Sequence, residues 1–259
     1  MASSDVINDN PHEQWQKLKG KGFVAHLQYF WDYYKYFVLG GILVIIFLTA
    51  LIHDITSTLP EGLYVVYLNS TYQGTQDELI ADYTPHTDLD TENYSIVIDT
   101  SFSVSTESYD EYTMSNMQKL MALTASHDLD VLVGDTDMYS YYSRNEMLAD
   151  LRDYYSEEEL AAFGDKVFYV DKSYIQKLEE MENATDEELE AFINSDIVFS
   201  GTDASVLEDP IPVGIVCTDS SVITDNMLYY NTECVIGMVV NTERPEEAMN
   251  YINYILGND

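Results

Sequence analysis

The feature that most constrains this chain is an unbroken apolar segment near its N-terminus. From Phe37 to Ile52 there is no charged residue, amide or histidine, and Thr49 has the only polar side chain. At about 1.5 Å of rise per residue, a helix over this segment is slightly shorter than the ~30 Å hydrocarbon core of a bilayer. The preceding Tyr-Tyr-Lys-Tyr closes the gap, because tyrosines suit the headgroup level and a lysine can snorkel. A helix packed on a soluble core would need a polar face, so the sequence predicts a transmembrane helix over residues 37–53.

The flanks of this segment favour an uncleaved anchor over a secretory signal peptide. A signal peptide has a short basic start and ends at a small-x-small cleavage site. Here 36 residues precede the apolar segment, and residues 49–60 contain no clear site of that kind. No cysteine follows the segment closely, which argues against a lipid-modified N-terminus. We therefore expect the helix to remain in the membrane.

The lysines around the segment predict its orientation. Lys17, Lys19, Lys21 and Lys35 precede it, whereas the next basic residue after it is Lys119. Because basic residues near a span stay on the cytoplasmic side, we expect a single-pass cell-membrane protein with its N-terminus inside and its C-terminal domain extracellular. The expected divisions are a cytoplasmic tail and interfacial segment at 1–36, the transmembrane helix at 37–53, a linker at 54–61 and an extracytoplasmic domain at 62–259.

The charge of the chain excludes one class of partner. The formal net charge is −35, and residues 1–36 contain as many lysines as acidic residues, so the excess lies beyond the span. Such a domain repels nucleic acid. The acidic residues are either a solvated surface or a means of attracting cations or a basic partner. A hydrophobic content of 46% argues for a folded core rather than disorder.

Strand-like and helix-like runs alternate through residues 62–259. The strand-like runs are 63–68, 94–99, 129–135, 166–171, 212–218 and 234–241. The helix-like runs are 75–83, 105–127, 138–148, 156–163, 184–195 and 244–256. Alternation of this kind is typical of an α/β domain. Near-continuous apolar strands indicate burial on both faces, so we predict a mostly parallel sheet with helices on both faces.

Motifs of the common catalytic classes are missing from the sequence. It contains no H-E-x-x-H, Walker loop, G-x-G-x-x-G or G-x-S-x-G, and its five histidines are scattered. Asp88, Asp90, Glu92 and Asp99 match the spacing of a calcium loop, but Asn93 stands where such a loop needs glycine. We therefore expect that the protein is not an enzyme and that it has no cofactor and no metal site.

The residues Gly134, Asp135 and Thr136 lie at the carboxyl end of a buried strand, where ligands of open α/β sheets bind. Tyr139 lies one helical turn further, and a tyrosine ring can pack against a ligand while its hydroxyl hydrogen-bonds. These four residues are the predicted ligand site. The alternatives are that Asp135 and its neighbour Asp137 cap the next helix, and that the tyrosines only pack it.

Two segments carry a family resemblance. DLDVLVGDTDMYSYYSRNEMLADLRDYYSEEEL (128–160) and VVNTERPEEAMNYINYIL (239–256) resemble segments of bacterial extracellular solute-binding proteins. The resemblance implies a non-catalytic, periplasmic-binding-protein-like fold in which Gly134, Asp135 and Thr136 form a ligand-facing loop. That family usually has two lobes, whereas the domain here has the length of one.

The cysteines suggest a further expectation. Cys217 ends one predicted strand and Cys234 begins another, so antiparallel pairing of these strands would allow a disulfide. Parallel strands would instead keep two buried thiols apart.

We expect a membrane-anchored module that binds or senses a small ligand. The alternative is a non-catalytic scaffold that joins a cell-envelope complex through a membrane-protein partner, and an extracellular hydrolase ranks third. A well-formed cleft beside residues 134–142 would favour binding, and a filled one would favour the scaffold.

Overall fold

The computed structural model describes residues 22–57, 59–106, 110–181, 184–193, 195 and 197–258. The chain forms two separate units, one ending at Leu59 and the other beginning at Pro60. Each unit is described by itself.

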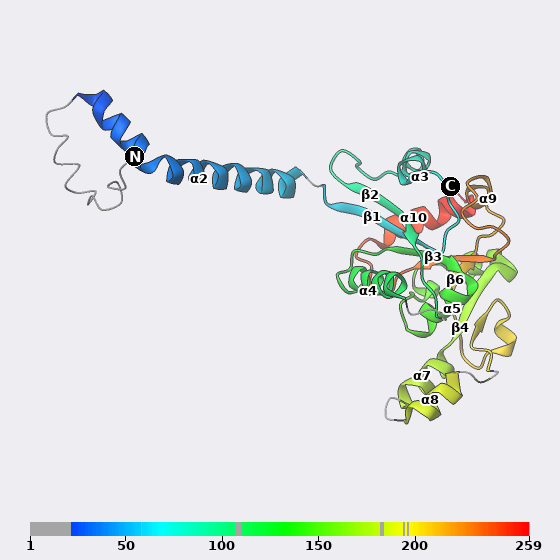
Figure 1. Cartoon of the computed structure of the whole chain (residues 1–259). Helices are drawn as coiled ribbons and strands as arrows, with labels where there is room; N and C mark the ends of the chain where they lie inside the picture. The colour runs from blue at the N-terminus through cyan, green and yellow to red at the C-terminus, as the bar shows by residue number, and fades with distance from the viewer. Residues whose placement is uncertain are drawn as a thin grey trace. The chain divides into compact units, whose positions relative to one another are not determined.

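The first unit is a single long helix, α2 (Phe23–Ser57), drawn in blue in Figure 1. Its section from Tyr34 to His53 has a mean hydropathy of 2.4, and none of it is buried. This section is therefore long and apolar enough to cross a membrane. The Thr49 hydroxyl donates to the carbonyl of Ile45 (2.8 Å), so the one polar side chain between Phe37 and Ile52 is satisfied within the helix.

The helix extends beyond both predicted boundaries of the span. It begins at Phe23, within the segment expected to lie at the interface, and it continues to Ser57, into the predicted linker at 54–61. The reason is that no proline lies between Phe23 and Pro60, and proline cannot donate a helical hydrogen bond.

The second unit is built on a seven-stranded sheet in the order β2-β1-β3-β7-β6-β4-β5 (Figure 1). The strands are β1 (Glu61–Leu68), β2 (Ser95–Phe102), β3 (Val131–Asp135), β4 (Val167–Asp171), β5 (Ser200–Gly201), β6 (Pro210–Val216) and β7 (Cys234–Met238). β1 pairs in parallel with β2 and β3, whereas β7, β6, β4 and β5 each pair antiparallel with their neighbours.

The sheet is therefore mixed, and the prediction of a mostly parallel sheet is wrong. The α/β class itself is confirmed. The first three strands alternate with helices and are parallel, as predicted. The prediction was wrong for the remaining strands because a buried strand has the same apolar run whichever way it points. Only the length and path of each connection fix the direction, and β6 and β7 are joined by a loop without a crossover helix of normal length.

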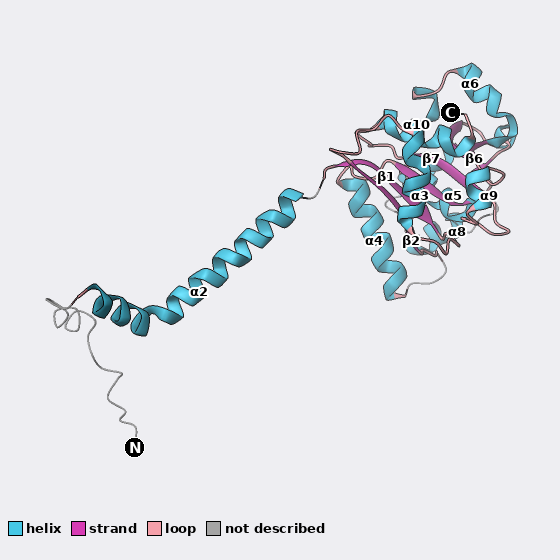
Figure 2. Ribbon diagram, turned by 90° about the horizontal axis from the view of Figure 1, so that it is seen from above, coloured by secondary structure: helices cyan, strands magenta, loops and turns pink. Residues whose placement is uncertain are grey.

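Helices cover both faces of the sheet (Figure 2). They are α3 (Gln76–Tyr83), α4 (Glu111–Ala125), α5 (Thr136–Arg144), α6 (Glu157–Phe163), α7 (Lys172–Glu180), α8 (Asp186–Ile193), α9 (Ser221–Asp225) and α10 (Pro245–Leu256). Short 3₁₀ turns lie at Thr84–His86, Leu151–Asp153, Gly164–Lys166 and Ala204–Val206.

The alternation of side chains along β1 divides the core in two. Leu63, Val65 and Tyr67 face α3, α9 and α10, whereas Val66 and Leu68 face α4, α5 and α7. Successive side chains of a strand point to opposite faces, so a strand buried on both sides must be apolar throughout. This accounts for the continuous apolar run that marks β1 in the sequence.

Candidate functional site

The loop that leaves β1 begins at a residue with unusual backbone geometry. Asn69 has φ of 56°, in the left-handed region that asparagine tolerates better than most residues. Its side-chain amide donates to Asp135 Oδ2 (2.9 Å), and its Oδ1 accepts from the amide of Val104 (2.8 Å). The backbone amide of Asn69 donates to the carbonyl of Phe102 (2.8 Å). Asn69 thus joins the carboxyl ends of β1, β2 and β3.

A second loop, residues 226–231 after α9, is fastened to the same strand ends. The hydroxyl of Tyr229 lies 2.7 Å from the carbonyl oxygen of Leu68 and 3.1 Å from that of Val133. The Leu228 carbonyl accepts from the amide of Thr71 (2.9 Å). Burial raises the pKa of Tyr229 far above its usual value, so this hydroxyl stays protonated and donating. The two loops are therefore held side by side.

Between these loops lies a hollow of about 490 Å³, which we call the β1 hollow. It is lined by Thr71, Tyr72, Gln73, Gly74, Glu78, Asp225, Asn226, Met227 and Tyr230. Met227 and Tyr230 are 65% and 69% exposed, although large apolar and aromatic side chains tend to be covered. Met227 and Asn231, which both lie in the second loop, have positive φ values of 50° and 53°. Because backbone of this kind clusters at ligand sites, the β1 hollow is the candidate ligand site.

The charge in the β1 hollow is negative. Its lining contains two carboxylates, Glu78 and Asp225, and no basic side chain. Glu78 accepts from the Tyr72 hydroxyl (3.1 Å) and from the amide of Thr75 (3.3 Å), so it is held at the start of α3. Burial and the bond to Glu78 raise the pKa of Tyr72. Gly74 leaves the space for that hydroxyl, because a Cβ there would lie 2.4 Å from it.

The four predicted ligand residues do not line this hollow. Asp135 is the N-cap of α5 and accepts from the amide of Met138 (3.0 Å), as the capping alternative expects, while also binding Asn69. Gly134 lies in β3 opposite Leu68, and Thr136 is the first residue of α5. Asp135 thus fixes the loop that forms the hollow. Direct ligand binding by these residues stays a prediction.

Tyr139 packs inside the core of the domain. It is fully buried, and its hydroxyl donates to the carbonyl of Val213 (2.8 Å). Gly214 and Gly237 make room for the ring, because a Cβ at either residue would lie within 2.4 Å of the hydroxyl. Tyr139 therefore joins α5 to β6 and β7 and does not reach the hollow.

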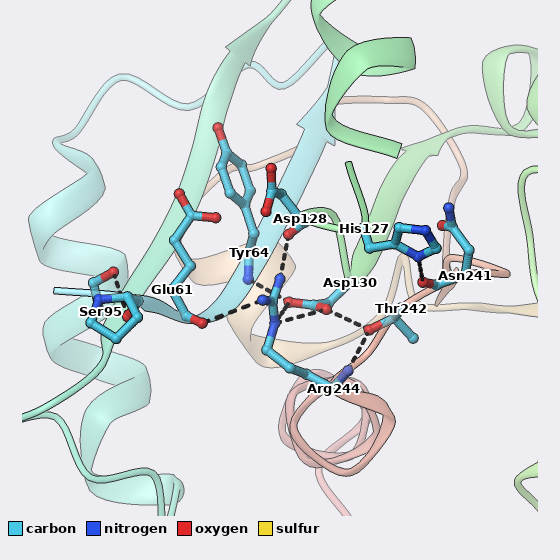
Figure 3. Close-up of polar contacts among 10 residues, drawn as sticks. Glu61, Tyr64, Ser95, His127, Asp128, Asp130, Asn241, Thr242 and Arg244 are labelled. Carbon is cyan, nitrogen blue, oxygen red and sulfur yellow. Dashed lines mark hydrogen bonds and ion pairs between the residues drawn. The ribbon is translucent and has the colours of Figure 1, made fainter. Parts of the chain in front are cut away.

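A second polar group, at the other end of β1, was not predicted from the sequence (Figure 3). Asp130 is fully buried and accepts from the Tyr64 amide (2.8 Å), the Thr242 hydroxyl and the Arg244 Nε (2.9 Å). The Arg244 guanidinium also donates to the carbonyl of Asp128 (2.6 Å). Burial raises the pKa of Asp130, although these donors favour its charged form. With every partner coming from the protein itself, the group ties β1, β3 and α10 together.

The described residues contain no group of three His, Cys, Asp or Glu side chains that could hold a metal. In particular, the calcium-like spacing of Asp88, Asp90, Glu92 and Asp99 does not assemble. Asp99 lies in β2 and binds Lys119 (3.0 Å), whereas Asp90 accepts from the amide of Glu92 within its own turn.

The residues of the β1 hollow come from loops about 150 positions apart, so no local spacing in the sequence could reveal them. The only local signal is Asn69, an asparagine placed directly after a buried strand. Comparison with known proteins adds nothing to this description: no protein family, curated protein or solved structure matches this chain.

Proposed function

We propose that this chain is a single-pass membrane protein whose extracellular domain binds a small ligand in the β1 hollow, without catalysis. The observation that carries the proposal is the pair of loops held over the carboxyl ends of β1 and β3, with Met227 and Tyr230 exposed and with positive φ at Met227. Ligands of α/β sheets bind at this end of the strands, and a hollow of this size suits a small molecule. The resemblance to solute-binding proteins supports ligand binding, and the lysine distribution supports the extracellular placement of the domain.

The lining of the hollow indicates a small amine as the ligand. Asp225 is exposed and forms no ion pair with any described residue, and Glu78 adds a second carboxylate nearby. Tyr72 and Tyr230 supply aromatic rings, whose faces attract cations. The acidic domain as a whole would also concentrate cations near the site.

One observation favours the alternative of an interaction subunit. Ile197, Val198 and Val206 are exposed apolar residues that line a common depression close to the edge strand β5. Exposed apolar side chains beside a sheet edge are typical of contact surfaces. This surface could bind a membrane-protein partner whether or not the β1 hollow binds a ligand.

The test compares two ligands of matched length, 1,4-diaminobutane and 1,4-butanediol, on the full chain in nanodiscs. The diamine should raise the melting temperature and the diol should not. Tyr230→Ala should weaken diamine binding roughly 2- to 30-fold, as loss of a cation–π contact of about 0.5–2 kcal/mol implies. Asp225→Asn should weaken it as well.

The control variant is Tyr94→Ala, because Tyr94 is a partly exposed tyrosine just before β2, at the opposite end of the strands. It should leave diamine binding unchanged. Equal shifts with the diol, or equal loss in the Tyr94 variant, would contradict the proposal.

A further inference from the structure

Arg144 stands out among the basic residues of the domain. Of the three arginines in the chain, Arg152 pairs with Asp150 (2.5 Å) and Arg244 with Asp130 (2.9 Å). Arg144 forms no ion pair or hydrogen bond through its guanidinium with any residue that the structure describes. In a chain with 46 acidic and 11 basic residues, acidic partners are abundant. A guanidinium left without one keeps all five of its donors for another acceptor.

Aromatic rings hold this guanidinium in place. It lies over the ring of Tyr141 (5.0 Å) and over that of Phe199 (5.7 Å). Phe199 stacks on Tyr174 of α7 (4.6 Å), which stacks in turn on Phe192 of α8 (4.9 Å). This ladder of rings fixes α8 against α7 and ends at Arg144. A cation positioned in this way loses little freedom when it binds an anion.

Beside Arg144 lies a hollow of about 690 Å³, which we call the α7–α8 hollow. It is lined by Tyr141, Arg144, Asn145, Glu146, Ile175, Leu178, Glu179, Leu189 and Ile193. Four of these are aliphatic side chains of α7 and α8, so one wall is apolar and the other carries the guanidinium. The site is separate from the β1 hollow, and the two share no lining residue.

We propose that the α7–α8 hollow binds an apolar monocarboxylate, whose carboxylate pairs with Arg144 and whose body packs on the aliphatic wall. A guanidinium recognises a carboxylate through two parallel hydrogen bonds. Glu146 and Glu179 also line the hollow and would repel a second negative charge, so the ligand carries only one. A free aliphatic acid and the C-terminus of a short apolar peptide both have this chemistry.

The experiment titrates the full chain in nanodiscs with hexanoate, hexanamide and trileucine by calorimetry, with empty nanodiscs subtracted. Hexanoate should bind and hexanamide should bind at least about tenfold more weakly, because a hydrogen bond to a charged group is worth about 1.5–3 kcal/mol. This comparison needs no variant, so it holds even where a substitution disturbs folding. Tighter binding of trileucine than of its C-terminal amide and of hexanoate would identify a peptide as the source.

Two variants test the role of Arg144 itself. Arg144→Gln should reduce hexanoate affinity at least about tenfold, and Arg144→Lys should retain part of it, since lysine keeps the charge but loses the fork. The control is Arg152→Gln, which removes an exposed arginine outside the hollow. Equal binding of hexanoate and hexanamide, or equal affinity in Arg144→Gln and the unsubstituted chain, would overturn the proposal, as would no binding of either carboxylate.

Discussion

At the scale of single residues, we expect the largest loss of stability when the buried ion pair of Asp130 and Arg244 is broken. Arg244→Met should destabilise the domain by about 3–5 kcal/mol, because it leaves the fully buried Asp130 without its counter-charge. Urea denaturation of the full chain measures the loss. Replacing both members, as Asp130→Leu with Arg244→Met, should recover much of it, since an apolar pair removes the stranded charge.

The matched control for this prediction is Arg152→Met. Arg152 is half exposed in its pair with Asp150, and exposed pairs contribute about 0–1 kcal/mol. A loss in Arg244→Met that is no larger than the loss in Arg152→Met would show that the group in Figure 3 does not hold the fold together.

The roles of the tyrosines could be predicted from the sequence only in part. The sequence predicted Tyr139 as a ligand residue next to a buried strand that ends at Asp135, but it could not separate tyrosine rings that bind a ligand from rings that pack in the core. Tyr139 and Tyr67 are fully buried and hydrogen-bond inside the core, whereas Tyr230 is exposed. That difference depends on contacts between distant segments, such as the hydroxyl of Tyr67 with that of Tyr251 (2.7 Å). Local spacing carries no information about such contacts.

At the scale of elements, β6 and β7 are antiparallel neighbours, as the disulfide prediction requires. Ile215 and Val216 pair with Ile236 and Val235, and the next position brings Cys217 beside Cys234. Their sulfur atoms are 3.6 Å apart, and both side chains are buried. The thiols are free in this structure, so the disulfide itself stays a prediction.

If the domain lies in an oxidising compartment, we expect Cys217 and Cys234 to form a disulfide on export, with two electrons and two protons passing to a cellular thiol oxidant. Closing this loop should add about 3 kcal/mol of stability, which a reductant would remove. Thiol labelling of the denatured, unreduced protein from membranes should find no reactive cysteine. Two labelled cysteines per chain would contradict the prediction.

The elements divide clearly into those the sequence could predict and those it could not. The helix α10, with Pro245 in its first turn and the left-handed Gly257 after its end, was predicted within one residue, whereas α4 begins at Glu111, six residues after its predicted start at 105. The five-residue helix α9 and the two-residue strand β5 were missed, because so few residues show no period. The nine-residue helix α7 was also missed, although the shorter helices α3, α6 and α8 were predicted. The sequence could not predict whether a strand is parallel or antiparallel to its neighbours. A strand buried on both faces, such as β1, is recognised by its apolar run, but that run is the same in either direction.

At the scale of the whole molecule, the proposed single-pass topology makes a prediction about which part of the chain is accessible from outside the cell. Protease added to intact bacterial cells that produce the chain should degrade residues beyond 60, because the lysine distribution predicts an N-terminus inside the cell. A protease added after lysis is the control for accessibility. Protection of the domain in intact cells, or release of a mature form that begins after residue 50, would contradict the topology.

The binding function is tested most directly by hydrogen–deuterium exchange of the full chain in nanodiscs, with and without saturating 1,4-diaminobutane. We predict slower exchange in residues 69–75 and 226–231, the two loops that form the β1 hollow, and unchanged exchange in α7 and α8. Unchanged exchange in both loops, or slowing confined to other parts of the domain, would contradict it.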